Sequence, residues 1–371
     1  MTEIKKWYEI NNTQEIISPS LLVYPDRIKK NVEMMIKIAG GTEFLRPHIK
    51  THKIAEIVKM QMEFGISKFK CATIAEAELL AKCKTKDILL AMQPVATNMK
   101  RFFKLIEKYP KSQFSTIVDN YNSVNEISQH ALSNTLKISL WLDINNGMDR
   151  TGIQPNKKAL ELYRTIHTNP NLIAKGFHVY DGHIHDTDLE QRREVCNNDF
   201  EPVIKLKDDL ERSGIKIETI IAGGTPTFPI HKYRKGVEVS PGTPLLWDAG
   251  YGAKYNDLKF LPAAVLLTRV ISKPKHNLTC LDLGHKSVAS EMDFPRVKLL
   301  GKINCEQIGQ SEEHLVVECK NDNEFKIGDN VYAVPMHICP TVAKYKEVLT
   351  IVDGEVTGSW EIAARDQKIL V

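Results

Sequence analysis

Between residues 43 and 245, short β-rich runs alternate with longer amphipathic segments, and no other feature of the sequence constrains the fold as strongly. The β-rich runs are EFLRPHIK, KFKCAT, DILLAMQP, FSTIVDN, KISLWLDI, AKGFHVYDG, ETIIAGG and VEVSPGT. Such alternation predicts parallel βαβ units. Eight strands within about 200 residues predict a (β/α)8 barrel, with an open doubly wound sheet as the alternative.

The pattern changes after about residue 250, where strand-like runs are joined by turn-rich connections. These runs are AAVLLTRVISK, LTCLDLGHKS, HLVVECK, NVYAVPMHICP and EVLTIVDGEVTGSWEI. They predict a second, all-β domain. We therefore expect the barrel to occupy residues 26–248 and the β-domain to combine residues 1–25 with 249–371. The early strand PSLLVYP precedes the barrel and could pair with it.

Composition excludes several classes of protein. The net charge of +4 is small for 371 residues and the basic residues are dispersed, so no nucleic-acid surface is expected. The N-terminal MTEIKKWYEI has no apolar core of a secretory signal, and FLPAAVLLTRVI is too short for a membrane span. The seven cysteines are scattered without a CxxC motif, which predicts reduced thiols in the cytoplasm.

The segment RPHIKTHK places Lys50 between two histidines. Burial on a barrel strand would lower the pKa of this lysine. On a strand, His48 and His52 would share its face, and cationic neighbours would lower that pKa further. Such an amine is a nucleophile suited to aldehydes. A solvated basic strand end accounts for the same residues equally well.

Two further motifs follow predicted strands, at the end of a barrel where active sites lie. HVYDGHIH, residues 178–185, offers Tyr180 and His183 for stacking and acid–base chemistry. IAGGTPT, residues 221–227, has two glycines that would let backbone N–H groups approach a phosphate. A tight turn is the alternative for the second motif, and without GxGxxG or a Walker lysine it does not indicate a dinucleotide or ATP site.

PMHICP, residues 335–340, contains a candidate metal pair. On a strand, His337 and Cys339 would face the same way. Imidazole with thiolate suits zinc, and two protein ligands would leave positions open for water or substrate. A buried thiol beside a core histidine is the alternative.

In this order RPHIKTHK, LDINNGMDRTGI, YDGHIH, AGGTPT, PGT with WD, LDLGHKS and MHIC resemble the D-threonine aldolase and D-serine dehydratase family. That family is related to alanine racemase and has the fold-type III pyridoxal-phosphate architecture. The resemblance covers nearly the whole chain. RPHIKTHK and MHIC are its most specific motifs, because they are far apart and carry different halves of the chemistry.

The resemblance implies a role for each candidate residue. Lys50 matches the lysine that holds pyridoxal 5'-phosphate covalently, and Arg150 matches the arginine that approaches its phenolic oxygen. The remaining matches are His48, Tyr180 and His183 near cofactor and substrate, Gly223, Gly224 and Thr225 around the phosphate, and His337 with Cys339 at a divalent metal. The chain departs from the family pattern at Ser240, where an arginine is usual, and at Pro244, where a tyrosine is usual.

The implied function is a pyridoxal-phosphate- and metal-dependent lyase that acts on D-β-hydroxy amino acids as a cytoplasmic homodimer. Cys339 favours zinc over manganese or magnesium and favours dehydration over aldol cleavage, although the motifs leave both reactions open, together with the identity of the D-amino acid. The alternative is a pyridoxal-phosphate-dependent racemase of the alanine racemase type, which needs no metal. A non-catalytic cofactor carrier is a third hypothesis, and the β-domain with its metal pair argues against it.

Overall fold

The computed structural model describes residues 6–301, 304–321 and 324–371, so the first five residues of the predicted β-domain lie outside it. The chain divides into two compact units. We call Glu33–Lys53, Val58–Gly242 and Asp366–Val371 the barrel unit, and Met1–Val32, Ile54–Ile57 and Thr243–Arg365 the β-unit. In the part of the chain that is described, no helix is both long and apolar enough to cross a membrane.

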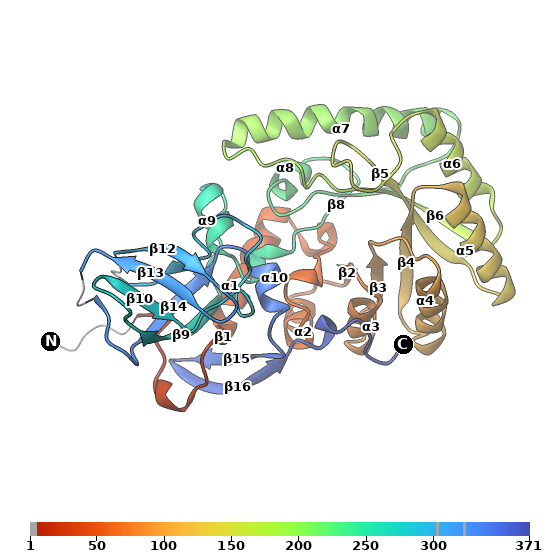
Figure 1. Cartoon of the computed structure of the whole chain (residues 1–371). Coiled ribbons are helices and arrows are strands. Elements are labelled where there is room, and N and C mark those ends of the chain that lie inside the picture. Colours follow the sequence, from red (N-terminus) through yellow and green to blue (C-terminus); the bar gives the residue numbers. More distant parts are fainter. Residues whose placement is uncertain (1–5, 302–303, 322–323) are drawn as a thin grey trace. The chain divides into compact units, whose positions relative to one another are not determined.

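The barrel unit contains a parallel sheet of seven strands in sequence order, with helices on its outer side (Figure 1). The strands are β2 (Lys68–Cys71), β3 (Asp87–Leu90), β4 (Gln113–Val118), β5 (Ile138–Ile144), β6 (Leu172–Val179), β7 (Thr219–Ala222) and β8 (Val237–Val239). The helices are α1 (Pro25–Ala39), α2 (Ala55–Glu63), α3 (Ile74–Lys82), α4 (Thr97–Lys108), α5 (Tyr121–Ser133), α6 (Lys157–Thr168), α7 (Leu189–Arg212) and α8 (Phe228–His231). The residues of α1 and of α2 are divided between the two units.

Residues 45–48 join the two edges of this sheet. Leu45 pairs with Val239 of β8, and His48 pairs with Lys70 of β2, both in parallel. The Arg46 amide donates to the Val239 carbonyl at 2.9 Å, and the Lys70 amide donates to the Pro47 carbonyl at 2.9 Å. This short segment takes the place of an eighth strand, which confirms the (β/α)8 prediction and excludes the open sheet.

Local sequence explains where the outer helices begin. Side chains at four N-caps accept from backbone amides: Thr73 from Glu76, Asn120 from Ser123, Asn156 from Lys158, and Asp188 from Gln191. In α4 the buried residues Met99, Phe102, Phe103 and Leu105 follow the helical period, so one face packs inward.

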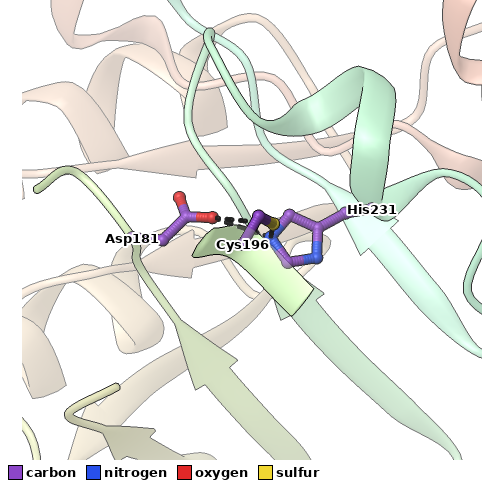
Figure 2. Close-up of side chains that lie close together, drawn as sticks. All are labelled: Asp181, Cys196 and His231. Atoms are coloured by element: carbon purple, nitrogen blue, oxygen red, sulfur yellow. Dashed lines mark hydrogen bonds and ion pairs between the residues drawn. The ribbon is translucent and has the colours of Figure 1, made fainter. Parts of the chain in front are cut away.

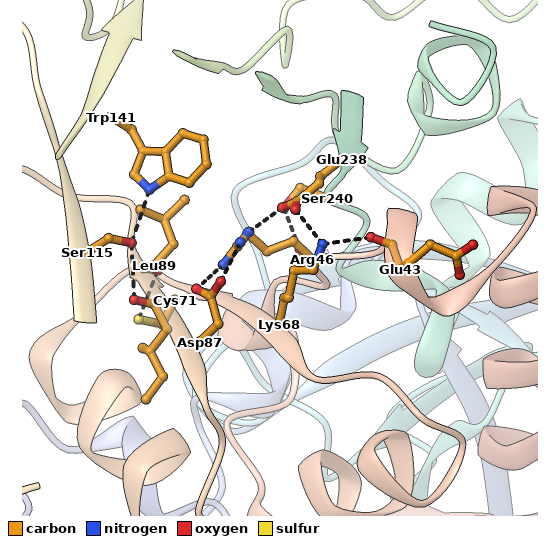
Figure 3. A network of polar contacts seen from close by, with 11 residues as sticks. Glu43, Arg46, Lys68, Cys71, Asp87, Leu89, Ser115, Trp141, Glu238 and Ser240 are labelled. Carbon is orange, nitrogen blue, oxygen red and sulfur yellow. Dashed lines mark hydrogen bonds and ion pairs between the residues drawn. The ribbon is translucent and has the colours of Figure 1, made fainter. Parts of the chain in front are cut away.

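Arg46 is the centre of a buried ion-pair network where the barrel closes (Figure 3). Its guanidinium is 1% exposed and donates to Asp87 of β3 at 2.6 Å and to Glu238 of β8 at 2.7 Å. Lys68 of β2 donates to the other oxygen of Glu238 at 2.5 Å, and the Ser240 hydroxyl donates to the Arg46 carbonyl at 2.7 Å. The network thus connects residues 45–48 with β2, β3 and β8.

Arg46→Met should lower the free energy of unfolding by about 3 kcal/mol, because it leaves two carboxylates without their buried cation. The loss should lie at the lower end of the range for a broken buried ion pair, because Glu238 still pairs with Lys68 and Asp87 is one-third exposed. Urea unfolding followed by circular dichroism measures the change. Arg212→Met is the matched control: its pair with Asp209 is exposed, so a change below about 0.5 kcal/mol is expected. A similar small change for Arg46→Met would contradict the assigned role.

The β-unit contains a nine-stranded sheet with the order β12-β13-β10-β9-β1-β15-β16, in which β14 also pairs with β9 and β11. The strands are β1 (Ser20–Val23), β9 (Ala264–Ser272), β10 (Leu278–Leu281), β11 (Val297–Leu299), β12 (Cys305–Gln310), β13 (Leu315–Cys319), β14 (Asn330–Pro335), β15 (Glu347–Val352) and β16 (Glu355–Glu361). β1 lies between β9 and β15, so PSLLVYP pairs in this sheet and not with the barrel. Two short helices, α9 (Ala249–Lys254) and α10 (Ile338–Val342), complete the unit.

The prediction that every cysteine is reduced is wrong for one pair. Cys305 and Cys319 lie opposite each other on β12 and β13 and form a disulfide. Strand register brings these two side chains together, and spacing along the sequence carries no sign of it. The five free cysteines are Cys71, Cys83, Cys196, Cys280 and Cys339.

Candidate functional site

Three cationic side chains surround Tyr180, which follows the carboxyl end of β6. Lys50 Nζ lies 5.5 Å and Lys70 Nζ lies 5.8 Å from the centroid of the Tyr180 ring. The guanidinium carbon of Arg150 lies 4.8 Å from the same centroid. Lys50, Arg150 and Tyr180, which the sequence placed in three separate motifs, are therefore close together at the end of the barrel where active sites lie.

Lys50 lies in a turn of 3-10 helix, Ile49–Thr51, and not on a strand. The Nδ1 atom of His48 caps this turn by accepting from the Lys50 amide at 3.2 Å. The expectation that His48, Lys50 and His52 share one face through strand alternation is therefore wrong. Burial, reinforced by the charge of Lys50, lowers the pKa of His48 well below its usual value, which keeps the capping imidazole neutral.

Lys70 of β2 is a member of the site that the sequence did not reveal. Its side chain is 3% exposed. Burial, followed by the charge of Lys50, lowers the pKa of Lys70 to about 7. KFKCAT resembles an ordinary half-buried strand, in which lysine would lie in solvent. The signal that could have found Lys70 is its alternation with Phe69 and Cys71, because inside a barrel both faces of a strand are covered.

Asp143 of β5 and His178 of β6 form a buried pair, with Oδ1 and Nδ1 2.6 Å apart. Burial lowers the pKa of His178 even though Asp143 favours its charged form. The second polar atoms of both side chains, His178 Nε2 and Asp143 Oδ2, are buried without a hydrogen-bond partner among the described residues, as is Asn146 Oδ1. Such atoms are uncommon in folded proteins, and at this position they suit a bound polar ligand.

The loop of residues 223–227 follows β7 and depends on its glycines. Gly223 has φ +79°, and a Cβ atom there would lie 2.9 Å from the His231 ring. The Gly223 amide donates to the Val179 carbonyl, and the Gly224 amide donates to Asp181 and Thr227. These two N–H groups are therefore engaged within the protein. A phosphate at this loop would have to be held by other donors.

The loop rests on a buried cluster of Asp181, Cys196 and His231 (Figure 2). Asp181 Oδ2 lies 2.7 Å from His231 Nε2, while Oδ1 accepts from the Thr227 hydroxyl at 2.8 Å. Burial raises the pKa of Cys196 to about 12, so its thiol stays protonated. The cluster supports the loop through Thr227, and its three possible ligand atoms lie within 4.8 Å of one another.

His183 faces the loop that carries Arg150. A Cβ atom at Gly147 would lie 2.8 Å from the His183 ring, and His183 Nε2 lies 2.7 Å from Asp199 of α7. The Asn145 side chain accepts from the amides of Gly147 and Asp149, which fixes the turn just before Arg150. Asp199 thus orients His183, a partner that no motif indicated.

The predicted metal pair lies in the β-unit, at the start of α10 and not on a strand. β14 ends at Pro335, so the prediction that His337 and Cys339 converge through strand alternation is wrong. They nevertheless meet, because the helical turn brings them together: a hydrogen bond with Cys339 raises the pKa of His337 to about 9. Glu291 holds the other side of the ring, with its carboxylate 2.5 Å from His337 Nδ1.

Comparisons with known proteins agree with the motif order. The family model for the alanine racemase N-terminal domain matches residues 23–248, and a model for a serine dehydratase domain matches residues 263–351. A D-threonine aldolase from Arthrobacter sp is 28% identical over 355 residues, covering 94% of this chain and 92% of the relative. A 3-hydroxy-D-aspartate aldolase from Paracoccus denitrificans (strain Pd 1222) is 27% identical over 367 residues, covering 95% of this chain and 92% of the relative.

The crystal structure of D-threonine aldolase from Filomicrobium marinum has the same fold. It superposes with a TM-score of 0.87 and 22% identity, over 96% of this chain and 98% of that one. The likeness covers the barrel together with the β-domain.

Proposed function

Since this chain belongs to the alanine racemase N-terminal domain family, we propose that it is a pyridoxal-phosphate- and metal-dependent lyase for D-β-hydroxy amino acids. The observation that carries the proposal is the pairing of the His337 imidazole with the Cys339 thiol in a chain that also gathers Lys50 and Arg150 around Tyr180. The aldolases that it resembles support the same substrate class.

The residues around Tyr180 fit pyridoxal phosphate. Asp143 and His178 have buried polar atoms without partners and interact electrostatically with Lys70, as a site for a polar and anionic ring would require. Asn146 has a further buried oxygen of this kind. Pyridoxal phosphate, when bound, withdraws electrons from the Cα atom of an amino acid. We propose that Lys50 Nζ holds it covalently and then moves the proton at Cα.

Each remaining residue of the barrel unit has a positioning or binding role in this proposal. His48 keeps Lys50 in its turn, Arg150 binds the phenolic oxygen, and Tyr180 packs against the ring. Gly223, Gly224 and Thr225 bring the backbone close enough to surround the phosphate, and the Thr225 hydroxyl already accepts from the Gly242 amide at 3.3 Å. His183, oriented by Asp199, is placed to exchange a proton with the substrate.

His337 and Cys339 fit a divalent metal. Glu291 fixes the ring of His337, as carboxylates commonly do for metal-bound imidazoles. Two protein ligands leave positions for the substrate's β-hydroxyl, which the ion would polarise as a Lewis acid. We propose zinc, because a thiolate is a soft ligand. Racemisation needs no metal, so the pair favours a lyase over the racemase alternative.

A product screen tests the proposal. The purified protein, loaded with pyridoxal phosphate and zinc, is incubated with D-threonine, D-serine or 3-hydroxy-D-aspartate, with the L-enantiomers as controls. Glycine with an aldehyde indicates aldol cleavage, whereas a 2-oxo acid with ammonia indicates dehydration. Either product from the D-forms alone supports a lyase, and the thiolate of Cys339 leads us to expect dehydration. Racemisation without either product would contradict it.

We further propose that the enzyme is a cytoplasmic homodimer in which the β-domain of one subunit lies near the barrel mouth of the other. The support is the family membership, together with the need to exclude water from a barrel mouth. Light scattering should give twice the mass of 42.1 kDa. An active monomer at working concentration would contradict the dimer.

A further inference from the structure

Lys70 is a buried cation without a partner. Its side chain is 3% exposed, and within the described ranges its Nζ atom forms no hydrogen bond or ion pair, only the contact with the Tyr180 ring. Lysine is rarely buried unless it is paired. Arg46, which is buried to a similar extent, has two carboxylate partners. The pattern points to a group that meets its counterion only when a ligand binds.

The position of Lys70 points to the same conclusion. Strand alternation turns its side chain away from Phe69 and Cys71 and toward Tyr180. Lys50 and Arg150 lie over the same ring and likewise have no carboxylate partner in the described part of the chain. Three unpaired cations around one aromatic ring form a site for an oxyanion.

We infer that Lys70 binds an oxyanion beside Tyr180, either the phenolic oxygen of the cofactor or the carboxylate of the substrate. This inference rests on the cofactor part of the proposed function. It adds a binding residue on β2 to the lysine and arginine already assigned.

Binding of the oxyanion should be accompanied by uptake of a proton, because of the charges that face Lys70. In the free site, burial and then Lys50 lower the pKa of Lys70 to about 7, so much of it is uncharged above that pH. A bound anion favours the ammonium form and raises the pKa again. The other charged or titratable groups that face Lys70 are Arg46, His48, Asp143, His178 and Asp181.

The sign of the pH dependence is fixed by this linkage. Below pH 7 Lys70 is already protonated, and its contribution to binding does not change with pH. Above pH 7 the site must take up a proton from solvent as the ligand binds, so affinity falls by about tenfold per pH unit until the pKa of the complex is reached.

The test compares the wild type with Lys70→Met, a substitution that removes the amine but keeps most of the length of the side chain. The first probe is 4-deoxypyridoxine 5'-phosphate, which has the phenolic oxygen and phosphate but no aldehyde, added to the cofactor-free full chain. The second is D-alanine, which has the carboxylate but no β-hydroxyl, added to the chain loaded with pyridoxal phosphate. Dissociation constants are measured by fluorescence or absorbance from pH 6 to 9.

If Lys70 binds the phenolic oxygen, Lys70→Met should raise the dissociation constant of the first probe by about tenfold to a hundredfold at pH 7. This is the usual contribution of a hydrogen bond to a charged group. The decline above pH 7 should disappear with it. If Lys70 binds the carboxylate, Lys70→Met should weaken only the binding of D-alanine. Equal affinities of wild type and variant for both probes would overturn the inference while leaving the cofactor assignment intact. A wild type that binds neither probe would overturn both.

Two further variants complete the design. Lys70→Arg carries a permanent charge, so a decline above pH 7 that persists in it would overturn the assignment of that decline to Lys70. Lys68→Met is the matched control on the same strand, because Lys68 pairs with Glu238 at the closure of the barrel. It should bind both probes as the wild type does, and a loss equal to that of Lys70→Met would reveal a general effect of altering β2.

Discussion

Lys50→Ala should purify as a folded protein without covalently bound pyridoxal phosphate. Its turnover should be lower than that of the wild type by more than about 10³-fold. The side chain is only partly buried and its Nζ contact is with the Tyr180 ring, so removing it leaves no buried polar group unpaired. The fold should therefore tolerate the substitution, while both the attachment point and the amine that moves the Cα proton are lost. Circular dichroism, cofactor absorbance and turnover together measure these effects.

Borohydride reduction of the loaded wild type followed by peptide mapping should locate the pyridoxyl group on Lys50. Lys53→Ala is a demanding control, since Lys53 is three residues away but is engaged in an ion pair with Glu76. It should retain the covalent cofactor. Finding the pyridoxyl group on Lys53 or Lys286 would rule out Lys50 as the attachment point.

Chelation of the metal, or the substitution Cys339→Ala, should lower lyase turnover by about 10² to 10⁴-fold. This factor corresponds to the several kcal/mol by which a Lewis acid lowers the barrier. The absorbance of the bound cofactor should change little, because Lys50 and Cys339 belong to different units of the chain. Zinc should restore chelated wild type best. Cys280→Ala removes another free cysteine of the β-unit and should leave turnover unchanged.

Cys339→Asp tests the ligand itself. A carboxylate in place of the thiolate should shift the preference toward manganese or magnesium, and we expect it to raise aldol cleavage relative to dehydration. Metal analysis of each sample accompanies the turnover assay. If enzyme shown to be metal-free retains full activity, the metal role is wrong and the racemase alternative takes precedence.

The barrel could be predicted from sequence because each strand is a short β-rich run bounded by an amphipathic helix. The order β2 to β8 repeats the predicted order of runs. The same reasoning failed for EFLRPHIK and PMHICP, where the chain leaves the strand after His48 and after Pro335. Period-two alternation says nothing about a turn, so it could not place Lys50 or Cys339 correctly.

The supporting residues of the site were hidden for a different reason. His231 meets Asp181 across 50 residues of sequence, and His178 meets Asp143 across 35. Pairs of this kind depend on how neighbouring strands, loops and helices pack, which only the folded barrel supplies. The motif YDGHIH did contain Asp181, but nothing local indicated that its carboxylate would hold the loop after β7.

The segment 45–48 also determines how the chain can aggregate. It contributes only two isolated bridges, yet it covers the open edges of both β2 and β8. Until it docks, the sheet presents two rows of unpaired N–H and C=O groups, which are templates for pairing with another molecule. Variants that loosen Arg46 should therefore lose soluble yield before they lose secondary structure, and the lost material should be rich in intermolecular β-sheet.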